Sequence, residues 1–165
     1  LKEVRRGRIS EYAEHTGCDF HPGRRPWAVE GAEVALPCAS QNELSAAEAK
    51  TMLDNGVHVV AEGANMPSEP GAVAQFVDAG ILFGPGKAAN AGGVAVSGLQ
   101  MVQNATFSTW TRDQVDARLL GIMVDIHRSC VQAAAEYDQP GNYVVGANIA
   151  GFEKIASAMV AQGVV

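Results

Sequence analysis

The chain has 165 residues, of which 47% are hydrophobic and 18% are charged. This composition is typical of a soluble folded protein and argues against an intrinsically disordered one. The length accommodates one domain with its own core, or part of a larger α/β protein. A formal net charge of −6 argues against a nucleic-acid partner, and the lack of an apolar run of about 18 residues argues against a membrane span.

The N-terminal residues and the cysteines indicate the setting of the chain. The segment LKEVRRGRIS is too charged for the apolar core of a signal peptide and contains no initiator methionine, so we expect the chain to begin inside a longer fold. Cys18, Cys38 and Cys130 lie far apart without a C-x-x-C pair, which predicts neither a disulfide framework nor a zinc site. A reducing, cytoplasmic setting is the simplest interpretation.

Residues 1–16 predict a helix that Gly17 ends. Six of the twelve basic residues fall within the first 25, but glutamates interleave them at helical spacings. This pattern favours a solvated helix face with local ion pairs over a phosphate-binding surface. The apolar side of the predicted helix is made of Val4, Ile9, Tyr12 and Ala13.

Three short apolar runs predict strands: EVALPC (residues 33–38), VHVVAEG (57–63) and ILFG (81–84). Each is too short for a helix, and the second is rich in β-branched residues. Predicted helices separate them, which indicates parallel strands joined by helical crossovers.

The first crossover helix opens with a capping box of Ser45 and Glu48 and runs to about residue 55, where Gly56 ends it. The second runs from Ser68, the expected N-cap, to Gly80, with a proline in its first turn.

After residue 90 the pattern predicts only helices, over about 92–106, 111–137 and 142–162. A second capping box, Thr111 with Gln114, opens the middle one. The last helix carries apolar residues at core-facing spacing, namely Ile149, Phe152, Ile155, Ala156 and Met159.

The segment GPGKAANAGGVAVS (residues 84–97) resembles a phosphate loop only in composition. A Walker loop needs a glycine where Ile81 stands and a hydroxyl where Ala88 stands, so that interpretation fails twice. A dinucleotide fingerprint is a weak match, because Ala89 replaces its third glycine.

Two interpretations remain for Gly92 and Gly93, where the third strand leads into a helix. They could let a carboxylate or amide approach free N–H groups at the helix start, with Ser97 adding a hydroxyl. Alternatively, they close a tight connection with close helix packing, and spacing alone favours this second interpretation.

Short polar side chains follow the first two predicted strands. Ser40, Gln41 and Asn42 follow the first, and Asn65 follows the second. Because ligands of open parallel sheets bind beside the carboxyl ends of the strands, these groups could receive a ribose or a carboxamide. The alternative is that they cap helices and close turns, which we favour for Asn42.

The remaining reactive side chains indicate structural roles. The four histidines have no spacing typical of zinc ligands or of a catalytic triad, and His127 is expected to be structural. Cys38 has no His or Asp near it in sequence, so we expect it to be a buried small residue. Glu62 is either a carboxylate of the crevice or a hydrogen-bonded residue at the strand end.

Several ordered motifs together resemble the hexameric glutamate dehydrogenases, in particular the NADP-dependent type. They are ALPCASQNEL, VAEGANMP, GPGKAANAGGVAVSGLQM, VDARLLGIMVDIH, NYVVGANIAGF and AMVAQGVV. The resemblance covers nearly the whole chain and implies reversible oxidative deamination of L-glutamate to 2-oxoglutarate and ammonia. It implies an α/β fold in which residues 1–106 are the remainder of a Rossmann-like dinucleotide-binding domain and residues 107–165 are C-terminal helices that pack toward a substrate domain.

The resemblance also implies roles for single residues. Ser97 corresponds to the serine that binds the side-chain carboxylate of glutamate, and Val94 and Gly93 line the substrate pocket. The cofactor side is implied for Ser40, which stands in place of the usual threonine, and for Gln41, Asn65 and Asn90.

The catalytic lysines, the proton-handling aspartate and the glycine-rich turn of that family are expected upstream of Leu1. The resemblance therefore implies a C-terminal fragment that is inactive alone and contributes neither a catalytic residue nor a metal ligand. NADP is expected in preference to NAD, and a homo-hexamer is expected for the whole enzyme. The alternatives are another amino-acid dehydrogenase or a non-catalytic nucleotide-binding or interaction module.

Overall fold

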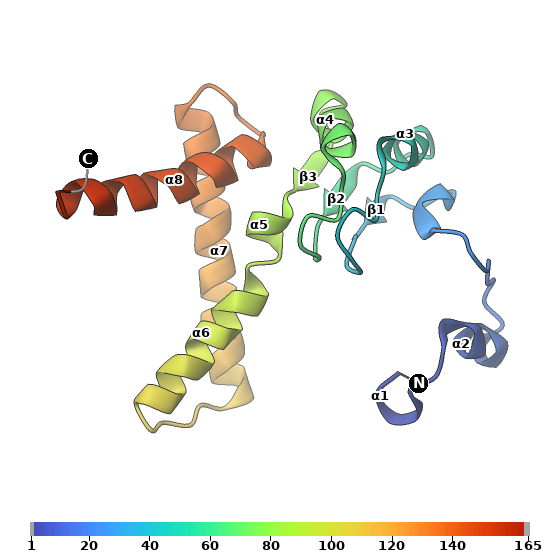
Figure 1. Cartoon of the computed structure of the whole chain (residues 1–165), viewed down its shortest axis with the longest axis horizontal. Coiled ribbons are helices and arrows are strands. Elements are labelled where there is room, and N and C mark those ends of the chain that lie inside the picture. Colours follow the sequence, from blue (N-terminus) through green and yellow to red (C-terminus); the bar gives the residue numbers. More distant parts are fainter. Residues whose placement is uncertain (1, 164–165) are drawn as a thin grey trace.

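The computed structural model describes residues 2–163 and has an α/β architecture (Figure 1). Its sheet contains β1 (Val34–Ala35), β2 (Val59–Ala61) and β3 (Leu82–Gly84), parallel and in the order β1-β2-β3. All three predicted strands are confirmed, although each is shorter than its apolar run.

The two faces of the sheet differ in their covering. Val60 and Phe83 are paired across β2 and β3 and are buried, with 0% and 4% of their surface exposed. Val34, Val59 and Leu82 form the adjacent row, on the opposite face because strand side chains alternate, and there Val34 and Leu82 are more than half exposed. Only one face is therefore fully packed in the described part of the chain.

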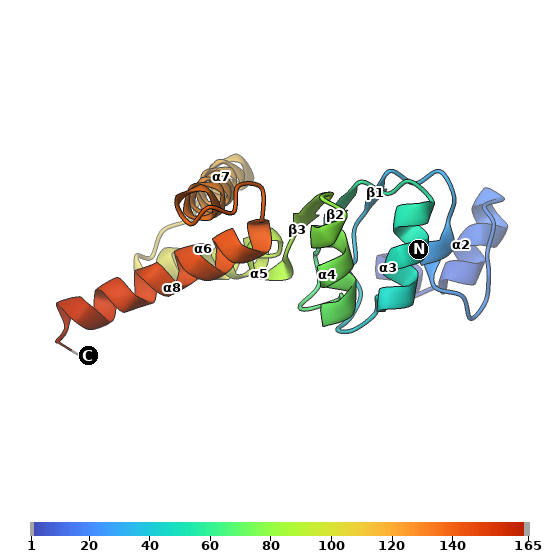
Figure 2. The same cartoon turned by 90° about the horizontal axis from the view of Figure 1, so that it is seen from above.

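The packed face is covered by α3 (Ala46–Asp54) and α4 (Pro70–Asp78), which lie side by side (Figures 1 and 2). Phe76 of α4 is fully buried and stacks on Phe83, with ring centroids 5.5 Å apart. Burying such a side chain stabilises the fold by roughly 1.5–3 kcal/mol. The core formed here comprises Leu44, Ala49, Met52, Val57, Val60, Ala72, Phe76 and Phe83.

The starts of these helices confirm one predicted cap and correct another. Ser45 caps α3 in a complete capping box with Glu48. At α4 the N-cap is Glu69 instead of Ser68, with Pro70 in the first turn. Ser68 is paired with Leu44 in an isolated parallel bridge, and this pairing holds it in extended backbone one residue before the cap.

The predicted N-terminal helix is two helices, α1 (Lys2–Arg5) and α2 (Ile9–Thr16). Arg6 adopts a left-handed φ of 51° and interrupts the helix, whereas Gly17 ends α2 in the left-handed region as predicted. Val4, Ile9 and Tyr12 are more than half exposed. The expected ion pairs of this segment are not formed among the side chains that the structure describes.

A 3-10 turn, η1 (Pro26–Ala28), links α2 to the sheet region. The Trp27 indole N–H donates to the carbonyl of Glu43 at 3.0 Å, and the Arg25 guanidinium donates to the same carbonyl at 2.8 Å. These bonds attach the N-terminal segment to the turn before α3.

Four helices follow β3: α5 (Gly86–Ala89), α6 (Gly92–Ala105), α7 (Arg112–Glu136) and α8 (Tyr143–Ala161). The last three confirm the predicted helices, and Thr111 and Gln114 form the expected capping box. The short α5 was not predicted. Helix α7 is the long element against which α6 and α8 pack, near its opposite ends (Figure 1).

Helices α7 and α8 cross closely at Gly146. A Cβ at this position would lie 2.0 Å from the carbonyl oxygen of Cys130. The crossing therefore requires glycine. Beyond it, the Tyr137 hydroxyl donates to Glu153 at 3.0 Å, and this acceptor and its negative charge raise the pKa of Tyr137.

The predicted core face of α8 is only partly buried. Ile149 and Ala156 are half-buried, but Phe152 and Ile155 are 70% and 63% exposed and Met159 is 44% exposed. The cause is visible in Figure 1, where α8 crosses α7 with its first half and then extends beyond it. By length and composition alone α8 could also cross a membrane, and 6% of that span is buried.

Candidate functional site

The loops after the three strands meet at one edge of the sheet, because the carboxyl ends of parallel strands lie together. Backbone bonds join the first two loops. The N–H groups of Gly63 and Ala64 donate to the carbonyl of Pro37 at 2.9 and 3.0 Å, and Asn42 N–H donates to Met66 at 3.0 Å. Asn42 has a left-handed φ of 53°, as expected of a residue that closes a turn.

Ser40 and Gln41 lie on the loop after β1 and line a cavity of about 410 Å³ with the loop after β2. Both side chains are exposed. The carboxylate of Glu43 accepts the N–H groups of Ala39 and Ser40 at 2.9 and 3.3 Å. This carboxylate fixes the backbone that presents Ser40 and Gln41.

Asn65 and Asn90 come from different loops and contact each other directly. The Asn90 amide nitrogen donates to Asn65 Oδ1 at 2.6 Å and to the Ala64 carbonyl at 3.2 Å. Among the described residues, Asn65 Nδ2 and Asn90 Oδ1 make no hydrogen bond. The pair can therefore offer the NH₂ group of Asn65 as donor and the Oδ1 atom of Asn90 as acceptor to a ligand.

A second cavity of about 500 Å³ adjoins this pair. Glu62, Asn65, Ser68, Lys87 and Asn90 contribute its polar lining. Because Asn65 lines both cavities, the two form one polar region along the carboxyl edge of the sheet.

The three residues expected to bind substrate lie at the start of α6, outside both cavities. Val94 is 73% exposed, Gly93 has open space around it, and Ser97 Oγ donates to the Gly93 carbonyl at 3.2 Å. The Gly93 N–H donates to Asn90 at 3.2 Å, so this expected free donor of the helix start is already used.

The two glycines at the start of α6 differ in their surroundings, and so bear differently on the two interpretations given above. A Cβ on Gly92 would contact Leu119 and Met123 of α7 at 3.7 Å, whereas a Cβ on Gly93 would contact nothing within 4 Å. Gly92 therefore faces the neighbouring helix, as the close-packing interpretation predicts, whereas Gly93 has open space beside it although its N–H and carbonyl are already hydrogen-bonded.

Lys87 and Glu62 hold segments of the chain together. Lys87 Nζ donates to Asn148 Oδ1 on α8 at 2.5 Å. Glu62 is 5% exposed and accepts two backbone N–H groups. Both interpretations of Glu62 apply, since its carboxylate is hydrogen-bonded at the strand end and also lines the cavity of about 500 Å³.

The histidines and cysteines form no metal centre within residues 2–163. His127 stacks on Tyr143 with ring centroids 5.7 Å apart, which agrees with a structural role. Cys38 is exposed, contrary to the prediction of a buried residue, because it lies beyond the end of β1 in the exposed loop. Cys130 is buried at the α7–α8 crossing, and burial raises the pKa of its thiol.

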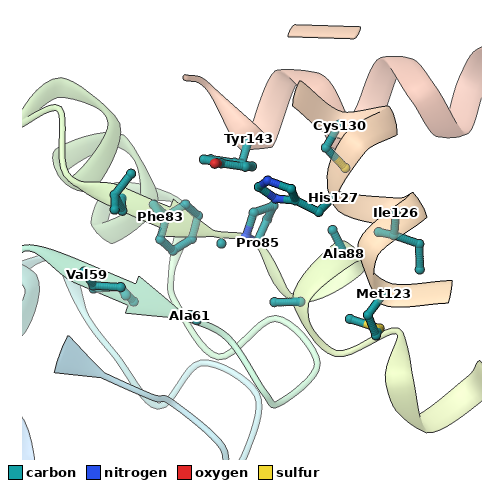
Figure 3. A pocket seen from close by; sticks show the side chains of 14 residues that line it. Val59, Ala61, Phe83, Pro85, Ala88, Met123, Ile126, His127, Cys130 and Tyr143 are labelled. Carbon is teal, nitrogen blue, oxygen red and sulfur yellow. The ribbon is translucent and has the colours of Figure 1, made fainter. Parts of the chain in front are cut away.

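An apolar cavity of about 310 Å³ lies between the less covered face of the sheet and α7 (Figure 3). Val59, Ala61, Met123 and Ile126 line it, with the rings of His127 and Tyr143 at one side. Its surface offers few polar groups, so a polar ligand fits the carboxyl edge of the sheet better.

Sequence reasoning missed Glu43 and the Lys87–Asn148 contact. Glu43 follows Ala39 by four residues, and a carboxylate so soon after a strand end is a usable signal, since short polar side chains in turns often accept hydrogen bonds from nearby backbone N–H groups. The Lys87–Asn148 contact spans 61 residues and leaves no local signal.

The family model for glutamate/leucine/phenylalanine/valine dehydrogenase matches residues 1–163. The chain is 56% identical over 164 residues to an NAD(P)-specific glutamate dehydrogenase of Xylanibacter ruminicola, covering 99% of this chain and 37% of that protein. It is 53% identical over 165 residues to the NADP-specific glutamate dehydrogenase of Salmonella typhimurium, covering 100% of this chain and 36% of that protein.

Solved structures agree with these similarities. The crystal structure of Plasmodium falciparum glutamate dehydrogenase superposes with a TM-score of 0.93 at 45% identity, covering 98% of this chain and 35% of that one. The chain thus spans a little over a third of the length of the relatives it matches.

Proposed function

Because this chain belongs to the glutamate/leucine/phenylalanine/valine dehydrogenase family, we propose that it is the C-terminal part of an NADP-dependent glutamate dehydrogenase. The whole enzyme would convert L-glutamate to 2-oxoglutarate and ammonia. The observation that carries the proposal is the polar carboxyl edge of the sheet, where the Asn65–Asn90 pair adjoins Ser40 and Gln41. Neutral amides and hydroxyls there suit a ribose and a carboxamide.

In this proposal, residues 1–106 complete a Rossmann-like dinucleotide-binding domain and residues 107–165 pack toward a substrate domain. The parallel sheet supports the first part. The second is supported by the exposed side chains of α8, which include Phe152 and Ile155, since apolar surface of this kind is stabilised by a partner.

The proposed binding residues fall into two groups, one for the cofactor and one for the substrate. Ser40, Gln41, Asn65 and Asn90 would bind NADP, which supplies the hydride acceptor. Gly93, Val94 and Ser97 would bind glutamate, with the Ser97 hydroxyl donating to its side-chain carboxylate.

This chain would bind and orient, because the amides and hydroxyl proposed to contact the cofactor do not exchange protons readily near pH 7. The two charged groups at the same edge are already engaged, Glu62 by backbone N–H groups and Lys87 by Asn148. The groups that move protons would lie upstream, so the 165 residues alone would have no turnover. A homo-hexamer in the cytoplasm completes the proposal.

The test is a dehydrogenase assay of the full-length protein that contains this chain. Glutamate should support reduction of NADP⁺, with a smaller kcat/KM for NAD⁺, and leucine, phenylalanine and valine should be poor substrates. Turnover of one of those three in place of glutamate would identify another amino-acid dehydrogenase. Absence of turnover with all four would favour a non-catalytic module.

A further inference from the structure

Helix α5 is attached at both of its ends to the loop after β2. At its start, the Gly86 N–H donates to Glu62 Oε2 at 2.6 Å. At its end, Asn90 donates to the Ala64 carbonyl and to Asn65 Oδ1. A four-residue helix stabilises itself poorly, so these contacts, together with the one from Lys87 to Asn148 on α8, determine where α5 lies.

Glu62 connects three segments through one buried carboxylate. It follows β2 directly, and besides Gly86 it accepts the N–H of Ser68 at 3.3 Å through Oε1. Burying a carboxylate is costly unless hydrogen bonds compensate it. No ion pair reaches Glu62 among the described residues, so backbone N–H groups provide this compensation.

The fit around this contact is tight. A Cβ on Gly86 would lie 2.9 Å from the Ala64 carbonyl oxygen and 3.2 Å from Glu62 Oε2. The hydrogen bond and the close approach depend on each other, since a side chain at residue 86 would push α5 away from the loop after β2.

We propose that Glu62 is a positioning residue for both halves of the site. It would act through Gly86 on α5, hence on the Asn65–Asn90 pair and on the start of α6, where Gly93, Val94 and Ser97 lie. This inference rests on the proposed function, because the cofactor and substrate roles of those residues belong to it. Glu62 would act through the backbone, because both of its carboxylate oxygens already accept backbone N–H groups.

The experiment compares Glu62→Gln with Glu69→Gln in the full-length protein. Glu62→Gln keeps the size of the side chain but replaces one accepting oxygen with an NH₂ group, which leaves one backbone N–H without its partner. Glu69 is the matched control, because it lies nearby, is half-buried and makes no cap hydrogen bond with its side chain.

Three quantities are measured well below the unfolding temperature: kcat, the KM values for NADP⁺ and glutamate, and amide hydrogen exchange over residues 84–91. In Glu62→Gln, kcat/KM should fall about tenfold or more, since small displacements of orienting groups are costly in catalysis. Exchange at Gly86 should accelerate about tenfold, as expected for loss of a charge-assisted hydrogen bond. Glu69→Gln should stay within about twofold of the wild type on all three.

A second variant, Gly86→Ala, disturbs the same contact from the other side and should show the same pattern if Glu62→Gln fails to fold. Unchanged kinetics in a folded variant would overturn the proposal, whatever its thermal stability. If the wild-type protein does not oxidise glutamate, the proposed function fails instead. The positioning role is then judged by exchange over residues 84–91 and by NADPH affinity, and unchanged values in Glu62→Gln would overturn it.

Discussion

The Ser97 hydroxyl makes a hydrogen bond within its own helix, and this bond can be exchanged for one to a ligand. Its hydroxyl donates to the Gly93 carbonyl one turn earlier, a bond that a serine in a helix can exchange for another acceptor by rotating about χ1. A substrate carboxylate is a stronger acceptor than a carbonyl. The exposed position of Ser97 on α6 makes this exchange accessible.

We therefore expect Ser97→Ala in the full-length enzyme to raise the KM for glutamate about tenfold or more, because a hydrogen bond to a charged group contributes about 1.5–3 kcal/mol. Steady-state kinetics measures this effect. Ser129→Ala is the matched control, since Ser129 donates to the Asp125 carbonyl one turn earlier on α7. Equal KM values in wild type and Ser97→Ala would contradict the assigned role.

The capping box of α3 makes the stability of this helix depend on pH, because one of its members, Glu48, is titratable. Burial by itself raises the pKa of Glu48, but hydrogen bonds from the Ser45 N–H and hydroxyl, together with Arg25, outweigh it and lower the pKa below its ordinary value of 4.5. A carboxylate with a lowered pKa in the folded state stabilises the fold above its unfolded pKa. That contribution is lost as the pH falls through the folded value.

Glu48→Gln should therefore lower the free energy of unfolding more at pH 7 than at a pH below 4, measured by urea denaturation at each pH. Ser45→Ala should cost about 0.5–2 kcal/mol near neutral pH and should reduce the same pH dependence, because it removes one donor to Glu48. A loss in Glu48→Gln that is the same at all pH values would refute the coupling.

The crossing of α7 and α8 depends on one glycine. Gly146→Ala would place a Cβ 2.0 Å from the Cys130 carbonyl oxygen, and separating the helices should cost about 1–3 kcal/mol. Gly151→Ala on the same helix meets nothing within 4 Å and should gain about 0.5–1 kcal/mol from helix propensity. Thermal or urea unfolding of both variants measures the contrast, and a Gly146→Ala variant as stable as the wild type would show that the crossing is not tight.

At the scale of the whole molecule, local signals predicted most of the elements. Both capping boxes act within three residues, so they could be read from Ser45 and Thr111 directly. The break at Arg6 could not, because a left-handed non-glycine residue leaves no pattern. The cap at Glu69 was missed because the pairing of Ser68 with Leu44, which is a tertiary contact, decides where α4 begins.

The sequence predicted the location of the site better than it predicted the contacts within it. The predicted parallel strands alone indicated that polar residues such as Ser40 and Asn65 gather at one edge of the sheet. The pairing of Asn65 with Asn90 depends on side-chain positions, which the sequence does not specify. The same holds for the contacts by which Glu43 and Glu62 hold the loops. The burial of α8 was mispredicted for a similar reason, since periodicity predicts an apolar face but not the partner that covers it.

The proposed function requires that the carboxyl edge of the sheet binds the nicotinamide cofactor. Amide hydrogen exchange of the full-length protein, with and without saturating NADPH, tests this binding. We predict protection in residues 38–42, 63–66 and 86–91, and none around the apolar cavity at residues 123–130. Binding of NADPH that leaves those three loops unprotected would contradict the account.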